Sequence, residues 1–90
     1  MSDQDLRKLL ADIQREIEET QPDEEAERQL LRKIQSEIRA LLDRPESDRL
    51  EAEESFLEQV NDAVDRFQVT YPRLTMMLSQ MSNILSNAGI

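Results

Sequence analysis

The sequence predicts an all-α protein of one small domain, 1–90, with four amphipathic helices near residues 3–19, 23–43, 48–69 and 72–88. Three observations predict this class. Apolar residues recur every three or four positions, which is the period of one face of a helix. Aromatic residues make up only 3% of the chain, so a β-sheet has little of the material that it favours. The prolines fall between the apolar stripes, where helices start and end.

The first helix is expected over residues 3–19, with Ser2 as its cap. Leu9 widens its apolar stripe, which has spacings of 4, 3 and 4. Thr20-Gln21-Pro22 is expected to end the helix, because a residue that precedes proline avoids the helical region. The stripe consists of Leu6, Leu10, Ile13 and Ile17.

The second helix is expected over residues 23–43, with Pro22 in its first turn and acidic side chains at its positive end. Leu30 and Leu42 flank its stripe, and Pro45 follows its end. The short connection to the first helix predicts an antiparallel helical hairpin with matched apolar seams. The stripe consists of Leu31, Ile34, Ile38 and Leu41.

The two helices share the pattern LLxxIQxEI, at residues 9–17 and 30–38. One interpretation is an internal duplication. The other is that two heptad-like helices, similar to those of a coiled coil, converge on the same residues because they meet the same packing requirement. Over nine positions we favour convergence.

The third helix is expected over residues 48–69 and begins within a polar, acidic stretch, 43–54, where Ser47 or Asp48 is expected to cap it. Its stripe again has helical spacing, with Phe56 and Ala63 beside it. We expect the aromatic residues of this region to be core anchors rather than parts of a ligand site. The stripe consists of Leu57, Val60, Val64 and Phe67.

The fourth helix is expected over residues 72–88, with Thr70 as its cap, Pro72 in its first turn and Gly89 at its end. Its only charged side chain is Arg73, whereas the chain before it is densely charged. Its apolar stripe contains Leu74, Met77 or Leu78, Met81, Leu85 and Ala88, with Ile84 alongside.

A second stripe on this helix is small and polar, and a neutral edge lies beside it. One interpretation is a surface for self-association or for a protein partner, uncharged on both flanks. The other is a central bundle helix that the chain's own helices bury on most sides. The polar stripe is Thr75, Ser79, Ser82 and Ser86, and the edge is Met76, Gln80, Asn83 and Asn87. The candidate interaction residues are Leu74, Thr75, Met77, Leu78, Ser79, Met81, Ser82, Leu85 and Ser86.

Catalysis, metal binding and cofactor binding are not expected. The chain has no Cys and no His, so it lacks thiol nucleophiles and the commonest metal ligand and general base. The single glycine leaves no Gly-rich phosphate loop. The acidic linker residues lack the Asp-x-Asp-x-Asp-Gly pattern of a calcium loop, so a solvated charged surface is expected there. Those residues are Glu46, Asp48, Glu51, Glu53 and Glu54.

Charge and hydropathy limit the partners. A net charge of −9 repels phosphate backbones, so nucleic-acid binding is not expected. No apolar run is long enough for a transmembrane segment, no secretory signal is expected at the start, and membrane-surface contact is expected to be weak without a basic face. A chain without disulfides is compatible with the cytoplasm.

Several stretches resemble a family of small bacterial all-helical proteins known only as a domain of unknown function. They are Leu6, Leu9 and Leu10, then Val64-Asp65-Arg66-Phe67 with Tyr71-Pro72-x-Leu74-Thr75, and finally residues 83–90. The resemblance covers nearly the whole chain. It implies a bacterial origin and supplies no activity, cofactor or site residue.

The expected function is therefore that of a small, acidic, non-enzymatic interaction protein. We expect it to form a homodimer or to bind a protein partner through its uncharged last helix, and dimerisation is one way to complete the bundle. The alternative is a small chaperone of the secretion type, or a regulatory escort protein, whose client covers the same face.

Overall fold

The computed structural model of the chain describes residues 3–44 and 54–88. In this part the protein is all-α, as predicted, with four helices packed against each other and no strand. Expectations about Ser2, residues 45–53, Gly89 and the Ala88 side chain lie outside the described residues. The helices are α1 (Asp3–Glu19), α2 (Glu25–Asp43), α3 (Glu54–Phe67) and α4 (Pro72–Ala88).

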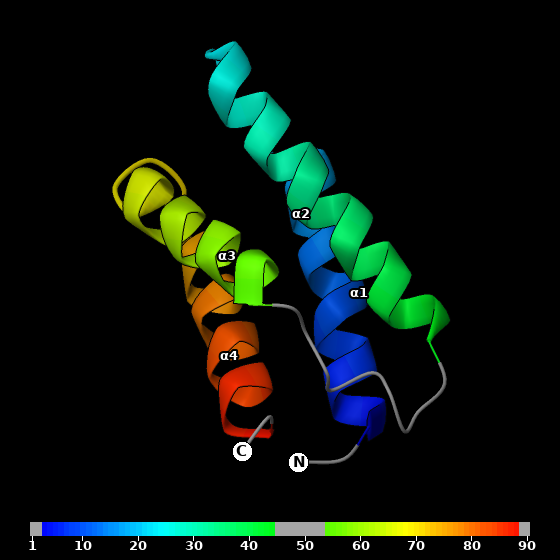
Figure 1. The fold of residues 1–90 in the computed structure, drawn as a ribbon. Coiled ribbons are helices and arrows are strands. Elements are labelled where there is room, and N and C mark those ends of the chain that lie inside the picture. The colour runs from blue at the N-terminus through cyan, green and yellow to red at the C-terminus, as the bar shows by residue number, and fades with distance from the viewer. Residues whose placement is uncertain (1–2, 45–53, 89–90) are drawn as a thin grey trace.

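The four helices form an up-down-up-down bundle, in which α1 and α3 run opposite to α2 and α4 (Figure 1). Each helix packs against two neighbours: α1 and α3 each contact both α2 and α4. The predicted antiparallel hairpin of α1 and α2 is therefore one side of a closed arrangement. The principal extents are 37 × 22 × 19 Å.

One core at the centre of the bundle receives a stripe from every helix. The predicted stripes of α1 and α2 are both confirmed, and their members are at most 6% exposed. The buried residues of these two helices are Leu6, Leu10, Ile13, Ile17, Leu31, Ile34, Ile38 and Leu41. At roughly 25 cal/mol per Å² of apolar surface removed from water, this core is the main source of stability.

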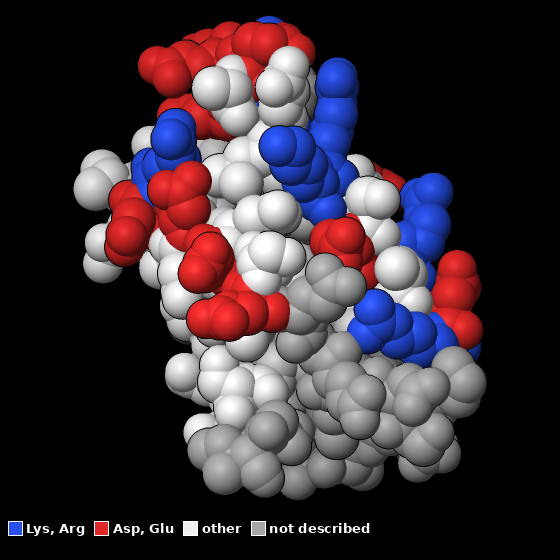
Figure 2. All heavy atoms as spheres, in the orientation of Figure 1, with Lys and Arg blue, Asp and Glu red and all other residues white. Residues whose placement is uncertain are grey.

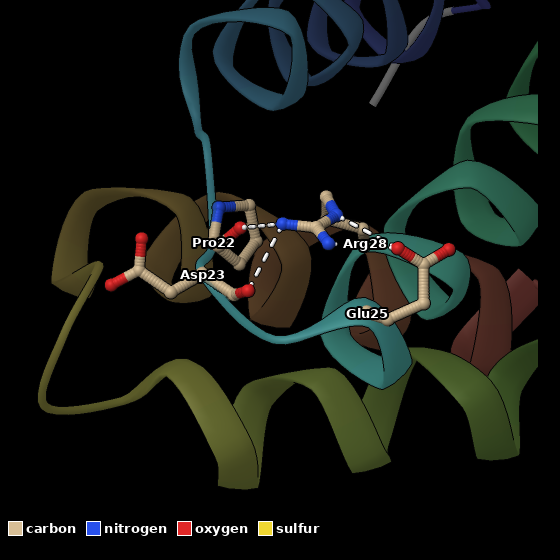
Figure 3. Close-up of polar contacts among 4 residues, drawn as sticks. All are labelled: Pro22, Asp23, Glu25 and Arg28. Atoms are coloured by element: carbon tan, nitrogen blue, oxygen red, sulfur yellow. Dashed lines mark hydrogen bonds and ion pairs between the residues drawn. The ribbon is translucent and has the colours of Figure 1, made fainter.

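Helix α2 begins later than predicted, at Glu25 rather than at residue 23. Pro22 is buried but lies outside the helix, and Glu24 is the cap, with extended backbone angles (φ −87°, ψ 137°). The Arg28 side chain holds this extended segment, because its Nη1 donates hydrogen bonds to the carbonyls of Pro22 and Asp23, both at 3.0 Å (Figure 3). The same guanidinium contacts Glu25 Oε2 at 2.8 Å.

The repeated pattern of residues 9–17 and 30–38 has the same packing role in both helices. Its Leu-Leu, Ile and final Ile positions have matching burial in α1 and α2. The two equivalent glutamines lie across the hairpin from each other, where Gln14 Nε2 donates a hydrogen bond to the backbone carbonyl of Gln35 at 3.3 Å.

The buried face of α3 is rotated relative to the prediction. Leu57 and Val64, placed in the stripe by the sequence analysis, are only half-buried and lie on its edge. Both sets have helical spacing and share Val60 and Phe67, and packing against α2 and α4 decides that Phe56 and Ala63 turn inward. The buried face of α3 is Phe56, Val60, Ala63 and Phe67.

Helix α3 also ends earlier than predicted, at Phe67, and residues 68–70 form a turn. Val69 in this turn is 92% exposed, so it does not belong to the core. Tyr71 caps α4 in place of the expected Thr70, since the Tyr71 carbonyl accepts the N–H of Thr75 at 3.2 Å. The rings of Phe67 and Tyr71 meet edge to face, with centroids 5.7 Å apart. Their contact positions the start of α4.

Two valines allow a matched test of this core. Val60→Ala removes two methyl groups from a fully buried site, and Val69→Ala removes the same groups from an exposed one. We expect urea denaturation to show a loss of about 2 kcal/mol for Val60→Ala and a change within about 0.5 kcal/mol for Val69→Ala. Equal effects of the two substitutions would contradict the assigned core.

The pKa of the Glu25 carboxyl is lowered by the hydrogen bond from Arg28 and by the charge of that guanidinium. A lowered folded-state pKa contributes stability above the unfolded-state value, and this contribution is lost as the pH falls through the folded-state value. In Arg28→Met we expect the pKa of Glu25, measured by NMR titration, to rise toward the ordinary value. Arg39→Met, farther along α2, is the control and should leave it unchanged.

Candidate functional site

The inward face of α4 is part of the core. Leu74, Leu78, Met81 and Leu85 are at most 2% exposed, so Leu78 rather than Met77 continues the predicted stripe. Met77 and Ile84 are half-buried at the edge of this face. Four of the nine candidate interaction residues are thus occupied by contacts within the chain itself.

One flank of α4 faces α1. Arg73 Nε lies 3.5 Å from Glu16 Oε1, an ion pair that connects the two helices. Farther along the same flank, a hollow of about 330 Å³ opens between the helices. Its lining is mostly apolar and consists of Leu9 of α1 with Gln80, Asn83 and Ile84 of α4. Met77 lines a second, more polar hollow, near Arg73 and Glu16.

The opposite flank of α4 carries the polar stripe and faces α3. Thr75 and Ser82 are only 6% and 8% exposed, and Thr75 Oγ1 donates a hydrogen bond to the Pro72 carbonyl at 2.9 Å. Small side chains here allow α3 to lie close against α4. Ser79 is half-buried, and Ser86, in the last turns of the helix, is exposed. The polar stripe therefore belongs mainly to packing between helices.

The neutral edge forms the side of α4 that none of α1, α2 and α3 covers. We call Met76, Gln80, Asn83 and Asn87 the outer face of α4; all four are exposed, Met76 to 61%. The sequence pattern distinguished this edge, but the candidate set did not include it. The interpretation of α4 as a helix that the chain's own helices bury on most sides fits its inward face and both flanks, whereas the outer face is open to solvent.

The outer face of α4 differs from the exposed surfaces of the other helices in its lack of charge. In α1, α2 and α3 the exposed positions include acidic and basic side chains, such as Lys8, Arg39 and Asp65. In Figure 2, red and blue atoms gather over α2 and α3, and the atoms over the C-terminal half of α4 are white. From Leu74 to Ala88, α4 contains no charged residue.

A hollow of about 440 Å³ lies at the connection between α1 and α2. Its polar groups are used within the chain: Arg28 binds two carbonyls and Glu25, and the Thr20 hydroxyl donates to the Glu16 carbonyl at 2.8 Å. The hollow also has Arg32 and Asp23 in its lining, at exposed positions open to solvent, and its polar groups do not converge on one point. Among residues 3–44 and 54–88, no group of acidic side chains is arranged to hold a metal ion.

In the same described residues, no helix is both long and apolar enough to cross a membrane. A family model described as a domain of unknown function, DUF4404, matches residues 6–90. No curated protein and no solved structure matches the chain.

Two serines of the polar stripe test the assignment of the α3–α4 interface. Ser82→Leu places a larger side chain at a buried position, and we expect it to destabilise the fold by about 1–3 kcal/mol through overpacking. Ser86→Leu makes the same change at an exposed position and is expected to alter stability by less than about 0.5 kcal/mol. Urea unfolding of both variants is the measurement. If Ser82→Leu is tolerated as well as Ser86→Leu, the stripe is not a packed interface.

Proposed function

The chain belongs to the family described as a domain of unknown function, DUF4404, and we propose that it acts without catalysis, as a protein–protein interaction module. Its contact surface is the outer face of α4. The observation that carries this proposal comes from residues 3–44 and 54–88 of a chain of net charge −9: after Arg73, the exposed face of α4 has no charge, whereas the exposed positions of α1, α2 and α3 include charged side chains. A surface helix of so acidic a protein otherwise carries charges at the positions that meet water.

Covering the outer face of α4 costs little desolvation free energy. Covering a charged side chain without a matched partner removes its hydration, which costs several kcal/mol. Asn and Gln amides each have donors and an acceptor, so a partner's polar groups of either kind satisfy them. Three of the four side chains on this face are amides: Gln80, Asn83 and Asn87.

Met76 supplies the apolar part of the contact. Its side chain is 61% exposed on a helix whose other large apolar residues are buried or half-buried. Methionine is flexible and polarisable, and it adapts to irregular partner surfaces. Depletion of charge at the centre of a patch, together with enrichment in Met, is also typical of protein interfaces.

The rest of the chemistry supports the same kind of role. The proposal requires no cofactor, and an acidic chain of net charge −9 is poorly suited to nucleic acids. We place the protein in the cytoplasm, because a chain without cysteine does not depend on an oxidising compartment.

Photocrosslinking in living cells tests this proposal. A photoreactive amino acid at Asn83 should give a discrete covalent adduct, because that position is covered in the complex. The control is the same amino acid at Lys33, an exposed position of α2. Adducts at neither position, or the same adducts at both, would contradict a role for the outer face of α4. An adduct with one different protein would indicate an escort role.

A further inference from the structure

We infer that the occupant of the outer face of α4 is a second copy of this chain. The two copies are related by a two-fold axis, and Met76 of each copy is seated in the hollow of the other, between Leu9 and Ile84. This inference rests on the proposed function and specifies the partner.

The Met76 side chain and the hollow beside Ile84 lie on the same side of one copy. Met76 projects from α4, and the hollow of about 330 Å³ is lined by Gln80, Asn83 and Ile84 with Leu9. At about 100° per residue, Gln80 is turned about 40° from Met76 and Ile84 about 80°. Along the helix, Met76 and Ile84 are about 12 Å apart, at 1.5 Å per residue. One partner helix can therefore contact both.

A two-fold axis lets Met76 of each copy contact Ile84 of the other at the same time. In an isologous interface, a contact from Met76 to Ile84 of the partner requires the reverse contact as well. With the two α4 helices antiparallel, the axis then passes near Gln80, midway between these residues. Each Gln80 faces its own symmetry mate, and two amides pair reciprocally, each donating to and accepting from the other.

Two chains of net charge −9 repel each other at long range. A contact through α3, in which acidic side chains outnumber basic ones, would also bring like charges together. The outer face of α4 avoids close like-charge pairs, and salt screens the long-range repulsion that remains. Association of this kind is therefore strengthened by added salt, whereas association that depends on ion pairs is weakened.

The size of the surface sets the strength of the dimer. Helix α4 has 17 residues, so it is about 25 Å long. The bundle is 19–22 Å across, which limits the covered area to about 500 Å² per copy and about 1,000 Å² in total. Specific interfaces of this size are at the lower end of the range. The expected dimer is weak and exchanges rapidly.

Analytical ultracentrifugation of the full chain tests the inference, at protein concentrations from about 1 μM to about 1 mM, the range of weak association. We expect a monomer–dimer equilibrium that shifts toward dimer as salt is added. Met76→Glu should weaken dimerisation at least about tenfold. Val69→Glu is the matched control, since it places the same charge at another exposed apolar residue and should have a much smaller effect. Circular dichroism checks that both variants keep their helix content.

A charge exchange at the axis tests the register. Gln80→Lys and Gln80→Glu should each dimerise poorly alone, because the axis places two like charges opposite each other. A mixture of the two variants should associate, because each Lys then faces a Glu. A mixture that stays monomeric, or a Met76→Glu effect equal to that of Val69→Glu, would overturn the two-fold arrangement.

A wild-type chain that is monomeric at every concentration would overturn self-association. A discrete photocrosslinked adduct from Asn83 with a different protein would still support the outer face of α4 as an interaction surface. Failure of the inference and failure of the proposed function are thus distinguishable.

Discussion

The structure depends on the burial of four apolar stripes in one shared core. Each helix has a single stripe, and a helix of 14 to 19 residues with one apolar face is at best marginally stable alone in water. The stripes become stable only when every helix contacts two neighbours, as in the closed order of α1, α2, α3 and α4. The chain has no disulfide to supplement this burial. Substitutions in any one stripe therefore affect the whole bundle.

The same constraint determines which side of α4 remains for another role. The core takes the inward face, α3 takes the flank with Thr75 and Ser82, and α1 takes the flank with Arg73 and Ile84. Only the outer face of α4 is left. A helix in this position needs polar residues there for solubility but does not need them to be neutral, and charged residues serve that purpose on the other helices. The packing of the chain does not explain why the outer face of α4 lacks charge. The proposed contact does explain it.

Much of the fold was predictable because it depends on local periodicity. The stripes of α1 and α2, the four-helix class and the bounds of α1 and α4 follow from the spacing of apolar residues and from the prolines. The errors occurred where two local patterns competed. Leu57 and Phe56 both begin a series with helical spacing, and only the neighbouring helices decide that Phe56 turns inward. Pro22 suits a first turn, but the hydrogen bonds of Arg28 hold it outside α2.

By itself, the sequence determined the helical class, the number of helices, the acidic surface and the lack of charge on the last helix. These properties depend on residue type and on spacing within one helix. Only the tertiary structure decided which residues of α4 are available to a partner. Leu74 and Met81 are covered, and Met76 is exposed. Leu9, 67 positions before Met76 in the chain, lies beside Gln80, Asn83 and Ile84 of α4. Helical periodicity defines the faces of a helix, but the packing of neighbouring helices decides which face meets solvent.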